Sequence, residues 1–322
     1  MKKISILIFA LFALISVSCD KDFEEVNTDP NNPTKVPAHL LLGNILRVNQ
    51  NAIYGMQQGG DMGMCWAQHL SKVQYNDEER YIPRRTAIDG VWNALYASVI
   101  SDAKSMGTLA EAEENKNLQA ISLVLQANAF QILTDLYGPI PFTNVAQTGV
   151  LKPTYDTQEV VYTGLIKMLT DADALFASAS ASETVVATSD LLYGGDVAKW
   201  RRLANSLKFK ALMRISNKVS VGSELQALVN AGNLMQSIGD SANLSYLTAQ
   251  PDANPIYETI VFGTRTEYKM SSVFINKLSS YADPRLPIMA AKNNAGLYVG
   301  NIPGEENSSN YLGFSSPGSL YL

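Results

Sequence analysis

Residues 59–85 concentrate the side chains best suited to hold a ligand. This stretch keeps no sustained helical period, and it carries Trp66, Tyr75 and Tyr81 among several arginines. Flat aromatic faces with a polar tip suit stacking on sugar rings, and long irregular segments inside a compact domain are usually functional. We therefore predict a ligand surface here, with Tyr257 and Tyr298 as further candidates from other non-periodic segments. The alternative is a covering loop packed by its own aromatic side chains.

The same stretch holds three consecutive acidic residues, Asp77, Glu78 and Glu79. Carboxylates together with neighbouring carbonyl oxygens are the ligands that Ca²⁺ prefers, so a structural calcium ion is one interpretation. A solvated acidic turn is the interpretation we favour. We expect no other metal or cofactor.

Catalytic motifs are scarce. The two histidines, His39 and His69, belong to no His-Glu-x-x-His pattern, and the chain lacks a Gly-x-Ser-x-Gly elbow and a phosphate-binding Gly-Lys-Ser/Thr loop. Glycosidases need only two suitably placed carboxylates, which 30 acidic residues can supply, so a surface glycosidase stays an alternative. The inventory favours a protein that is not an enzyme.

The N-terminus predicts a different chemistry, lipidation of Cys19. Two lysines, an apolar run and small residues precede this cysteine, which is the order of a secretory signal followed by a bacterial lipoprotein cleavage site. Residues 1–18 are then the signal peptide and 19–37 a tether rich in proline and asparagine. The acidic run 20–25 is similar to the signal that sends Bacteroidetes lipoproteins to the cell surface. With Cys19 lipidated, Cys65 has no partner for a disulfide.

Composition limits the partners further. Removal of residues 1–18 leaves 23 basic and 30 acidic residues, a net charge of −7. Nucleic acids and anionic membrane surfaces require a concentrated basic face, so neither is an expected partner, and the lipid is the expected membrane contact. The 46% hydrophobic content over 322 residues suffices for a substantial core, which we assign to one domain, 38–322.

Hydrophobic periodicity predicts a mainly α fold. Apolar residues recur at helical spacing in six segments, of which the second and third are joined too tightly to be other than antiparallel. The predicted helices span 38–58, 89–114, 117–137, 156–176, 196–215 and 223–231, with a break at 55–63 and one short helix at 271–280. Turn-rich sequence dominates beyond Gly239. The pattern indicates tetratricopeptide-like helical hairpins with loop-rich, irregular insertions.

Local signals refine two of these helices. Asp156 with Glu159 three residues on forms a variant capping box, and Asp196 caps the helix that carries Trp200. The opposite face of that last helix is basic, which we interpret as a solvated or salt-bridged stripe in an acidic protein. Its members are Arg201, Arg202, Lys208, Lys210, Arg214 and Lys218.

Six motifs in order resemble the SusD/RagB family of surface lipoproteins, and they cover most of the chain. They are the Cys19 region, Asp135-Leu-Tyr-Gly-Pro-Ile-Pro-Phe142, Tyr155-Asp-Thr-Gln-Glu159, Gly195-Asp-Val-Ala-Lys-Trp200, Ala204–Ser216 and Asp283-Pro-Arg-Leu286. We interpret the second motif as structural, since Gly138-Pro139 ends a helix. Trp200, Asn205 and Arg214 fit core and inter-helix contacts.

The resemblance implies a non-enzymatic helical protein on the outer face of the outer membrane. Such proteins cap a SusC-like TonB-dependent barrel and pass glycans, or in some branches peptides, into it. Glycan and peptide ligands both stay open, because aromatic residues serve both. Relatives continue with further helices where this sequence ends at Leu322, so we expect a chain that lacks C-terminal helical hairpins.

Overall fold

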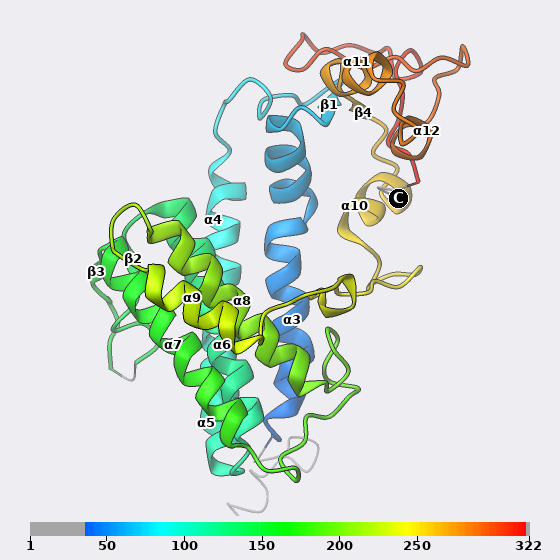
Figure 1. Cartoon of the computed structure of the whole chain (residues 1–322). Coiled ribbons are helices and arrows are strands. Elements are labelled where there is room, and N and C mark those ends of the chain that lie inside the picture. Colours follow the sequence, from blue (N-terminus) through cyan, green and yellow to red (C-terminus); the bar gives the residue numbers. More distant parts are fainter. Residues whose placement is uncertain (1–35, 148, 320–322) are drawn as a thin grey trace, which may run out of the picture. The chain divides into compact units, whose positions relative to one another are not determined.

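The computed structural model describes residues 36–147 and 149–319. Cys19 and the predicted signal peptide and tether up to residue 35 therefore lie outside the described residues. The chain divides into two units that meet between Pro37 and Ala38 in the sequence. The fold described below is that of the second unit, which begins at Ala38. Helices dominate this unit, as Figure 1 shows.

The first helix, α3 (His39–Tyr54), is followed by a π-helical stretch, η1 (Met56–Met64). The predicted break at 55–63 is correct only at Gly55, whose ψ of 156° interrupts the helix. The rest of that segment is helical, and the prediction of loop residues there was wrong. At Gly60 the Met56 side chain packs directly against the backbone. Any larger residue there would clash, because its Cβ would lie 2.6 Å from the Met56 sulfur.

The second predicted helix is present in three consecutive parts, α4 (Arg85–Asn93), η2 (Ala94–Ile100) and α5 (Ser101–Ala112). The middle part is π-helical, which a 3.6-residue period does not signal. Leu95, Val99, Ala103 and Met106 are fully buried along one face, as the spacing predicts.

Three long helices follow α5, each packed against the one before it: α6 (Lys116–Tyr137) against α5, α7 (Gln158–Ser178) against α6, and α8 (Val197–Ile215) against α7 (Figure 1). Asn115 caps α6 by accepting a hydrogen bond from the Leu118 N–H at 3.1 Å. Across the α5–α6 hairpin, the Ser122 hydroxyl donates to the Ala103 carbonyl at 2.6 Å. The helical-hairpin prediction is confirmed, and this layer holds the main hydrophobic core.

The cap of α7 differs from the prediction. Thr157, not Asp156, is the N-cap, and its hydroxyl accepts from the Val160 N–H at 3.4 Å. Asp156 instead accepts from the N–H groups of Phe142 at 3.1 Å and Thr143 at 2.8 Å. It thereby closes a small hairpin of β2 (Ile140–Pro141) and β3 (Tyr155–Asp156).

The basic stripe of α8 is salt-bridged, as predicted. Arg201 pairs with Asp173 at 2.6 Å and Arg202 with Asp240 at 2.7 Å. The cap by Asp196 is also confirmed, with the Lys199 N–H donating at 3.1 Å. Two sequence motifs are likewise structural: Gly138 adopts φ +79° at the end of α6, and Trp200 is fully buried.

After α8, α9 (Gly222–Ala231) ends at Gly232 and leads to a short 3₁₀ turn, η3 (Ile238–Asp240). The N–H of Gln236, the Arg202 guanidinium and the N–H and hydroxyl of Ser237 all donate to the Asp240 carboxylate. These donors lower its pKa from the ordinary 3.8 to about 2. Asp240 thus joins this turn to α8.

This joint gives the protein a pH-dependent stability that Asp240→Asn removes. Between about pH 4 and pH 2 the carboxyl group of Asp240 is protonated in the unfolded chain but still ionised in the native protein. The stabilisation is therefore present above pH 4 and is lost as the pH falls toward 2. We expect Asp240→Asn to lower the thermal midpoint at pH 6, with a gap to wild type that narrows toward pH 2. Melting curves across that range check it, with the exposed Glu111→Gln as control; a constant gap would contradict it.

The remaining elements surround a short ribbon in which β1 (Leu70–Lys72) pairs antiparallel with β4 (Tyr268–Met270). Near it lie α10 (Pro255–Tyr257), η4 (Glu258–Phe262), α11 (Ser272–Ser280) and α12 (Leu286–Met289). A second, smaller core forms here around Met56, Cys65 and Met270. None of the helices in the described part of the chain has the length and apolar character needed to cross a membrane.

Candidate functional site

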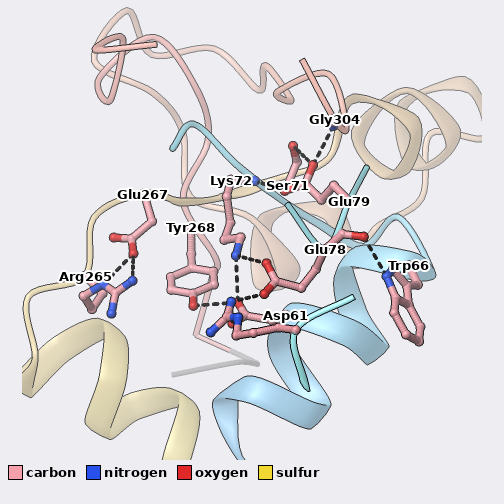
Figure 2. A network of polar contacts seen from close by, with 11 residues as sticks. Asp61, Trp66, Ser71, Lys72, Glu78, Glu79, Arg265, Glu267, Tyr268 and Gly304 are labelled. Atoms are coloured by element: carbon pink, nitrogen blue, oxygen red, sulfur yellow. Dashed lines mark hydrogen bonds and ion pairs between the residues drawn. The ribbon is translucent and has the colours of Figure 1, made fainter. Parts of the chain in front are cut away.

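The β1–β4 ribbon brings the irregular 59–85 segment against residues almost 200 positions later. At this junction lies an ion cluster, which we define as Asp61, Lys72, Glu78 and Arg84; Figure 2 shows its buried members. The Lys72 ammonium lies 3.1 Å from an Asp61 oxygen and 2.8 Å from a Glu78 oxygen. Arg84 contacts the same two carboxylates from the outer side.

The ion cluster balances two cations against two carboxylates. Only 1% of the Lys72 side chain is exposed, and Asp61 and Glu78 are almost as buried, whereas Arg84 reaches solvent. Buried charges persist only when they are paired and hydrogen-bonded, and here each one is. The cluster therefore holds η1, β1 and the 76–84 turn in one arrangement.

Tyr268 completes the cluster from β4. Its hydroxyl donates to Asp61 at 2.7 Å, as Figure 2 shows, and its ring lies 5.8 Å from the Lys72 ammonium. Burial raises the pKa of this phenol well above its ordinary value, and the negative charge of Asp61 adds to that effect. Tyr268 therefore remains a hydrogen-bond donor throughout the physiological range.

The Glu79 carboxylate lies outside the ion cluster and accepts its hydrogen bonds from uncharged groups. It accepts from the Ser71 hydroxyl at 2.9 Å and from the N–H groups of Lys72 at 2.5 Å and Gly304 at 2.8 Å. Burial raises the pKa of this carboxyl despite the three bonds. The prediction of a solvated acidic turn was wrong for Glu78 and Glu79, because both are buried and serve structural contacts, and only Asp77 is exposed.

Calcium binding by this acidic run stays untested as a prediction. The Glu78 carboxylate binds Lys72 and Arg84, and the Glu79 carboxylate binds other partners, so the two do not converge. Among residues 36–147 and 149–319, no group of three or more acidic, histidine or cysteine side chains is placed to hold a metal ion.

A cavity of about 370 Å³ opens beside the ion cluster. Most of its walls are polar, and it is bounded by η1, the 72–84 segment and the η4–β4 region. Its lining consists of Met56, Gln57, Asp61, Lys72, Tyr75, Asp77, Arg84, Thr259, Arg265 and Tyr268. Arg265 pairs with Glu267, and its guanidinium lies 5.9 Å from the Tyr75 ring and 6.0 Å from the Tyr268 ring.

The three aromatic residues predicted from the 59–85 segment are all exposed, but Trp66 and Tyr81 do not line the cavity. We call them the aromatic surface: Trp66, Tyr75 and Tyr81. The Trp66 and Tyr81 rings stack with centroids 6.3 Å apart and planes at 26°, and the Trp66 indole donates to the Glu78 carbonyl at 2.8 Å. Tyr75 lines the cavity itself. Ligand contact by these rings remains a prediction.

Two of these rings are presented by an unusual backbone. Tyr75 has φ +59° and Tyr81 φ +58°, in the left-handed region that bulky residues rarely adopt. Such conformations persist only where the surrounding structure enforces them, and they concentrate at binding sites. The ion cluster and the Glu79 contacts supply that enforcement, because they fix the turn between the two tyrosines.

The other two candidates do not join this surface. Tyr257 is half-buried, with its ring edge against Phe262 at 5.2 Å. Tyr298 packs on the smaller core, with the Lys292 ammonium 5.6 Å from its ring. Neither residue lines the cavity beside the ion cluster.

Sequence reasoning missed Asp61, Lys72, Arg265 and Tyr268. Asp61 lies in a glycine-rich stretch and Lys72 lies between Ser71 and Val73, and no periodic pattern placed either of them on a common face with its partners. The position of Lys72 in the short segment Leu70-Ser71-Lys72-Val73, which has an apolar residue at each end, was the one available hint of a buried charge. Its carboxylate partners lie 11 and 6 residues away in the chain, whereas Tyr268 reaches the cluster through the pairing of β1 with β4.

The fold and the site define a mainly helical protein with a polar cavity and with exposed aromatic rings on one of the segments that border it. Residues 30–320 match the SusD-like family described as starch-binding and associating with the outer membrane, and the chain belongs to this family. No curated protein matches the chain significantly.

Solved structures agree on the fold. A SusD homolog from Bacteroides fragilis NCTC 9343 has a TM-score of 0.72 at 24% identity, covering 89% of this chain and 63% of its own. An outer membrane protein linked to nutrient binding, from Bacteroides vulgatus ATCC 8482, has a TM-score of 0.71 at 28% identity, and the match covers 89% of this chain and 64% of that protein. A chitin-binding SusD homolog from Flavobacterium johnsoniae has a TM-score of 0.72 at 21% identity, and the match covers 88% of this chain and 61% of that homolog.

The predictions of a mainly α fold and of SusD/RagB membership are confirmed by these matches. The chain spans less than two thirds of the length of each of these structures.

Proposed function

We propose that this protein captures oligosaccharides at the aromatic surface and the adjoining cavity. The observation that carries the proposal is a turn, fixed by a buried ion cluster, that exposes the stacked rings of Trp66 and Tyr81 and places the exposed Tyr75 at a polar cavity of about 370 Å³. A sugar ring stacks its C–H face on an aromatic ring, while its hydroxyls accept hydrogen bonds from a guanidinium and donate hydrogen bonds to a carboxylate. Arg84, Arg265 and Asp77 supply such groups at the cavity.

The proposal includes a place in the cell. The family association with the outer membrane and the Cys19 motif support a lipid-anchored protein on the outer face. There it delivers its ligand to a SusC-like TonB-dependent barrel, without catalysing a reaction. Protease accessibility on intact cells and copurification with a barrel protein test this part. Retention of Cys19→Ala on the membrane after the barrel gene is deleted would contradict the lipid anchor.

Calorimetric titration with malto-oligosaccharides and chito-oligosaccharides tests the capture site. We expect the Trp66→Ala/Tyr81→Ala double variant to bind at least about 10-fold more weakly, since two stacking contacts are lost. Tyr75→Ala is expected to weaken binding about 2- to 10-fold.

The matched control is Tyr281→Ala. Tyr281 is 68% exposed, close to the 64% of Tyr75 and the 71% of Tyr81, and does not line the cavity. Equal affinity for wild type and the double variant would overturn the site. Binding of peptides but not of any oligosaccharide would favour the peptide alternative, and steady release of shorter sugars would favour a glycosidase.

A further inference from the structure

A second aromatic cleft lies at the other side of the start of α4. It has a volume of about 450 Å³ and is formed by α4, the end of α6 and the β2–β3 hairpin. Its rings are Trp92, Tyr137 and Tyr155, and its polar side chains are Arg85, Asp89 and Asn93. None of these residues belongs to the site described above.

The rings of this cleft form a stepped platform. Trp92 and Tyr155 are nearly parallel, with planes at 24° and centroids 6.1 Å apart, and Tyr137 stands edge-on to Trp92 at 89° and 5.1 Å. At 6.1 Å two stacked rings must be offset, so each leaves part of its face uncovered by the other. Tyr155 is 66% exposed, while Trp92 is half-buried against the main core.

The platform is held rigidly. The Tyr137 hydroxyl donates to the Ile88 carbonyl at 2.5 Å, which joins the end of α6 to α4. Tyr155 is paired with Pro141 in the hairpin, which the Asp156 carboxylate closes by accepting from the Phe142 and Thr143 N–H groups. A ring fixed before binding costs little conformational entropy when a ligand arrives.

Polar groups border the rings on one helix face. Arg85 and Asp89 stand one turn apart on α4, with a guanidinium nitrogen 3.5 Å from a carboxylate oxygen. An exposed pair of this kind contributes little stability, so both groups are free to exchange their contact for a ligand hydroxyl. Asn93, another turn along, adds an amide with both donor and acceptor. Planar polar groups beside flat rings are the complement of a pyranose.

The cleft adjoins the first site through the chain itself. Arg84 lines the cavity beside the ion cluster and Arg85 lines the cleft, although they are consecutive residues. We propose that the cleft is a second sugar-ring site, with Trp92 and Tyr155 as the stacking platform and Arg85, Asp89 and Asn93 as the hydroxyl contacts. This inference rests on the proposed capture of oligosaccharides and extends it to a second surface.

The chain offers a site-resolved test because it has three tryptophans in three environments. Trp66 belongs to the aromatic surface, Trp92 to the cleft, and Trp200 is fully buried. Fluorine NMR of the purified protein carrying 5-fluorotryptophan reports them separately once Trp→Phe variants assign the signals. We expect titration with maltoheptaose or chitohexaose to shift the Trp92 signal as well as the Trp66 signal, with Trp200 as the reference.

A matched pair of variants then isolates the cleft. Tyr155→Ala is expected to weaken the midpoint of the Trp92 titration about 2- to 10-fold while the Trp66 titration keeps its midpoint. Tyr281→Ala, equally exposed, is expected to change neither. Asp89→Asn with Arg85→Gln is expected to weaken the Trp92 response alone.

The outcomes separate the two proposals. A shift at Trp66 with none at Trp92 overturns the second site and leaves the proposed function standing. A shift at Trp92 alone supports the cleft and overturns the first site. If neither the Trp66 nor the Trp92 signal shifts, both proposed sites are overturned. A Trp92 shift with apolar peptides but with no sugar overturns the ligand class assigned to the cleft.

Discussion

Replacing Lys72 with methionine is expected to lower the free energy of unfolding by about 3–5 kcal/mol. Methionine fills a similar volume but leaves Asp61 and Glu78 buried with Arg84 as their one cation, where Lys72 now lies 3.1 and 2.8 Å from them. An uncompensated buried charge is far costlier than a lost surface ion pair. Urea unfolding at pH 7, with an unchanged m-value, measures the effect.

Lys167→Met is the control for this variant. Lys167 also pairs with an aspartate, Asp171 at 2.5 Å, but 74% of its side chain is exposed, so its loss is expected to cost about 0.3–0.5 kcal/mol. Adding Glu78→Gln to Lys72→Met removes the one excess negative charge, since Arg84 still balances Asp61, and is expected to recover about half of the loss. A cost below about 1 kcal/mol for Lys72→Met would show that the ion cluster does not hold the site together.

Replacing Trp200 with alanine is expected to cost about 3–5 kcal/mol, because its side chain is fully buried in the main core and leaves a large cavity. Trp200→Phe fills most of that space but loses the indole N–H that donates to Asp190 at 2.8 Å, for which we expect about 1–3 kcal/mol. Asp190 keeps its bonds from the N–H groups of Leu192, Tyr193 and Gly195 in both variants.

Trp66→Ala serves as the comparison for Trp200. Trp66 is 47% exposed and its one hydrogen bond goes to a backbone carbonyl, so its truncation is expected to cost about 1 kcal/mol. Denaturant titrations of all three variants check the order. If Trp66→Ala were as destabilising as Trp200→Ala, Trp66 would be a structural residue of the turn, and its loss of sugar binding would no longer report on contact.

The helical body could be predicted because its information is local. The spacing that buries Leu95, Val99, Ala103 and Met106 is written within one segment, and so is the cap that Asp196 gives to α8. Local rules failed where two neighbours could serve the same role. Asp156 and Thr157 are both good N-cap residues. The Asp156 carboxylate accepts hydrogen bonds from the Phe142 and Thr143 N–H groups instead, and Thr157 caps the helix.

The candidate site was predictable only in part, for the same reason. Trp66, Tyr75 and Tyr81 stood out because they interrupt periodicity in one short segment, and the structure exposes all three, stacks Trp66 on Tyr81 and places Tyr75 at the cavity. The cleft went unpredicted because Trp92 reads as part of a helix stripe and Tyr155 as part of a motif, and nothing local joins them.

By itself, then, the sequence determined the long helices, the family and the segment that carries the exposed rings, because periodicity, caps and motifs act over a few residues. Only the tertiary structure decided that Lys72 is buried between two carboxylates and that Tyr268 reaches Asp61 at 2.7 Å. The Tyr268 contact depends on the pairing of β1 with β4 across almost 200 residues, and the burial of Lys72 depends on the packing of the segments around it. Strand partners and buried ion pairs are selected by the packing of the whole chain, which no local pattern encodes.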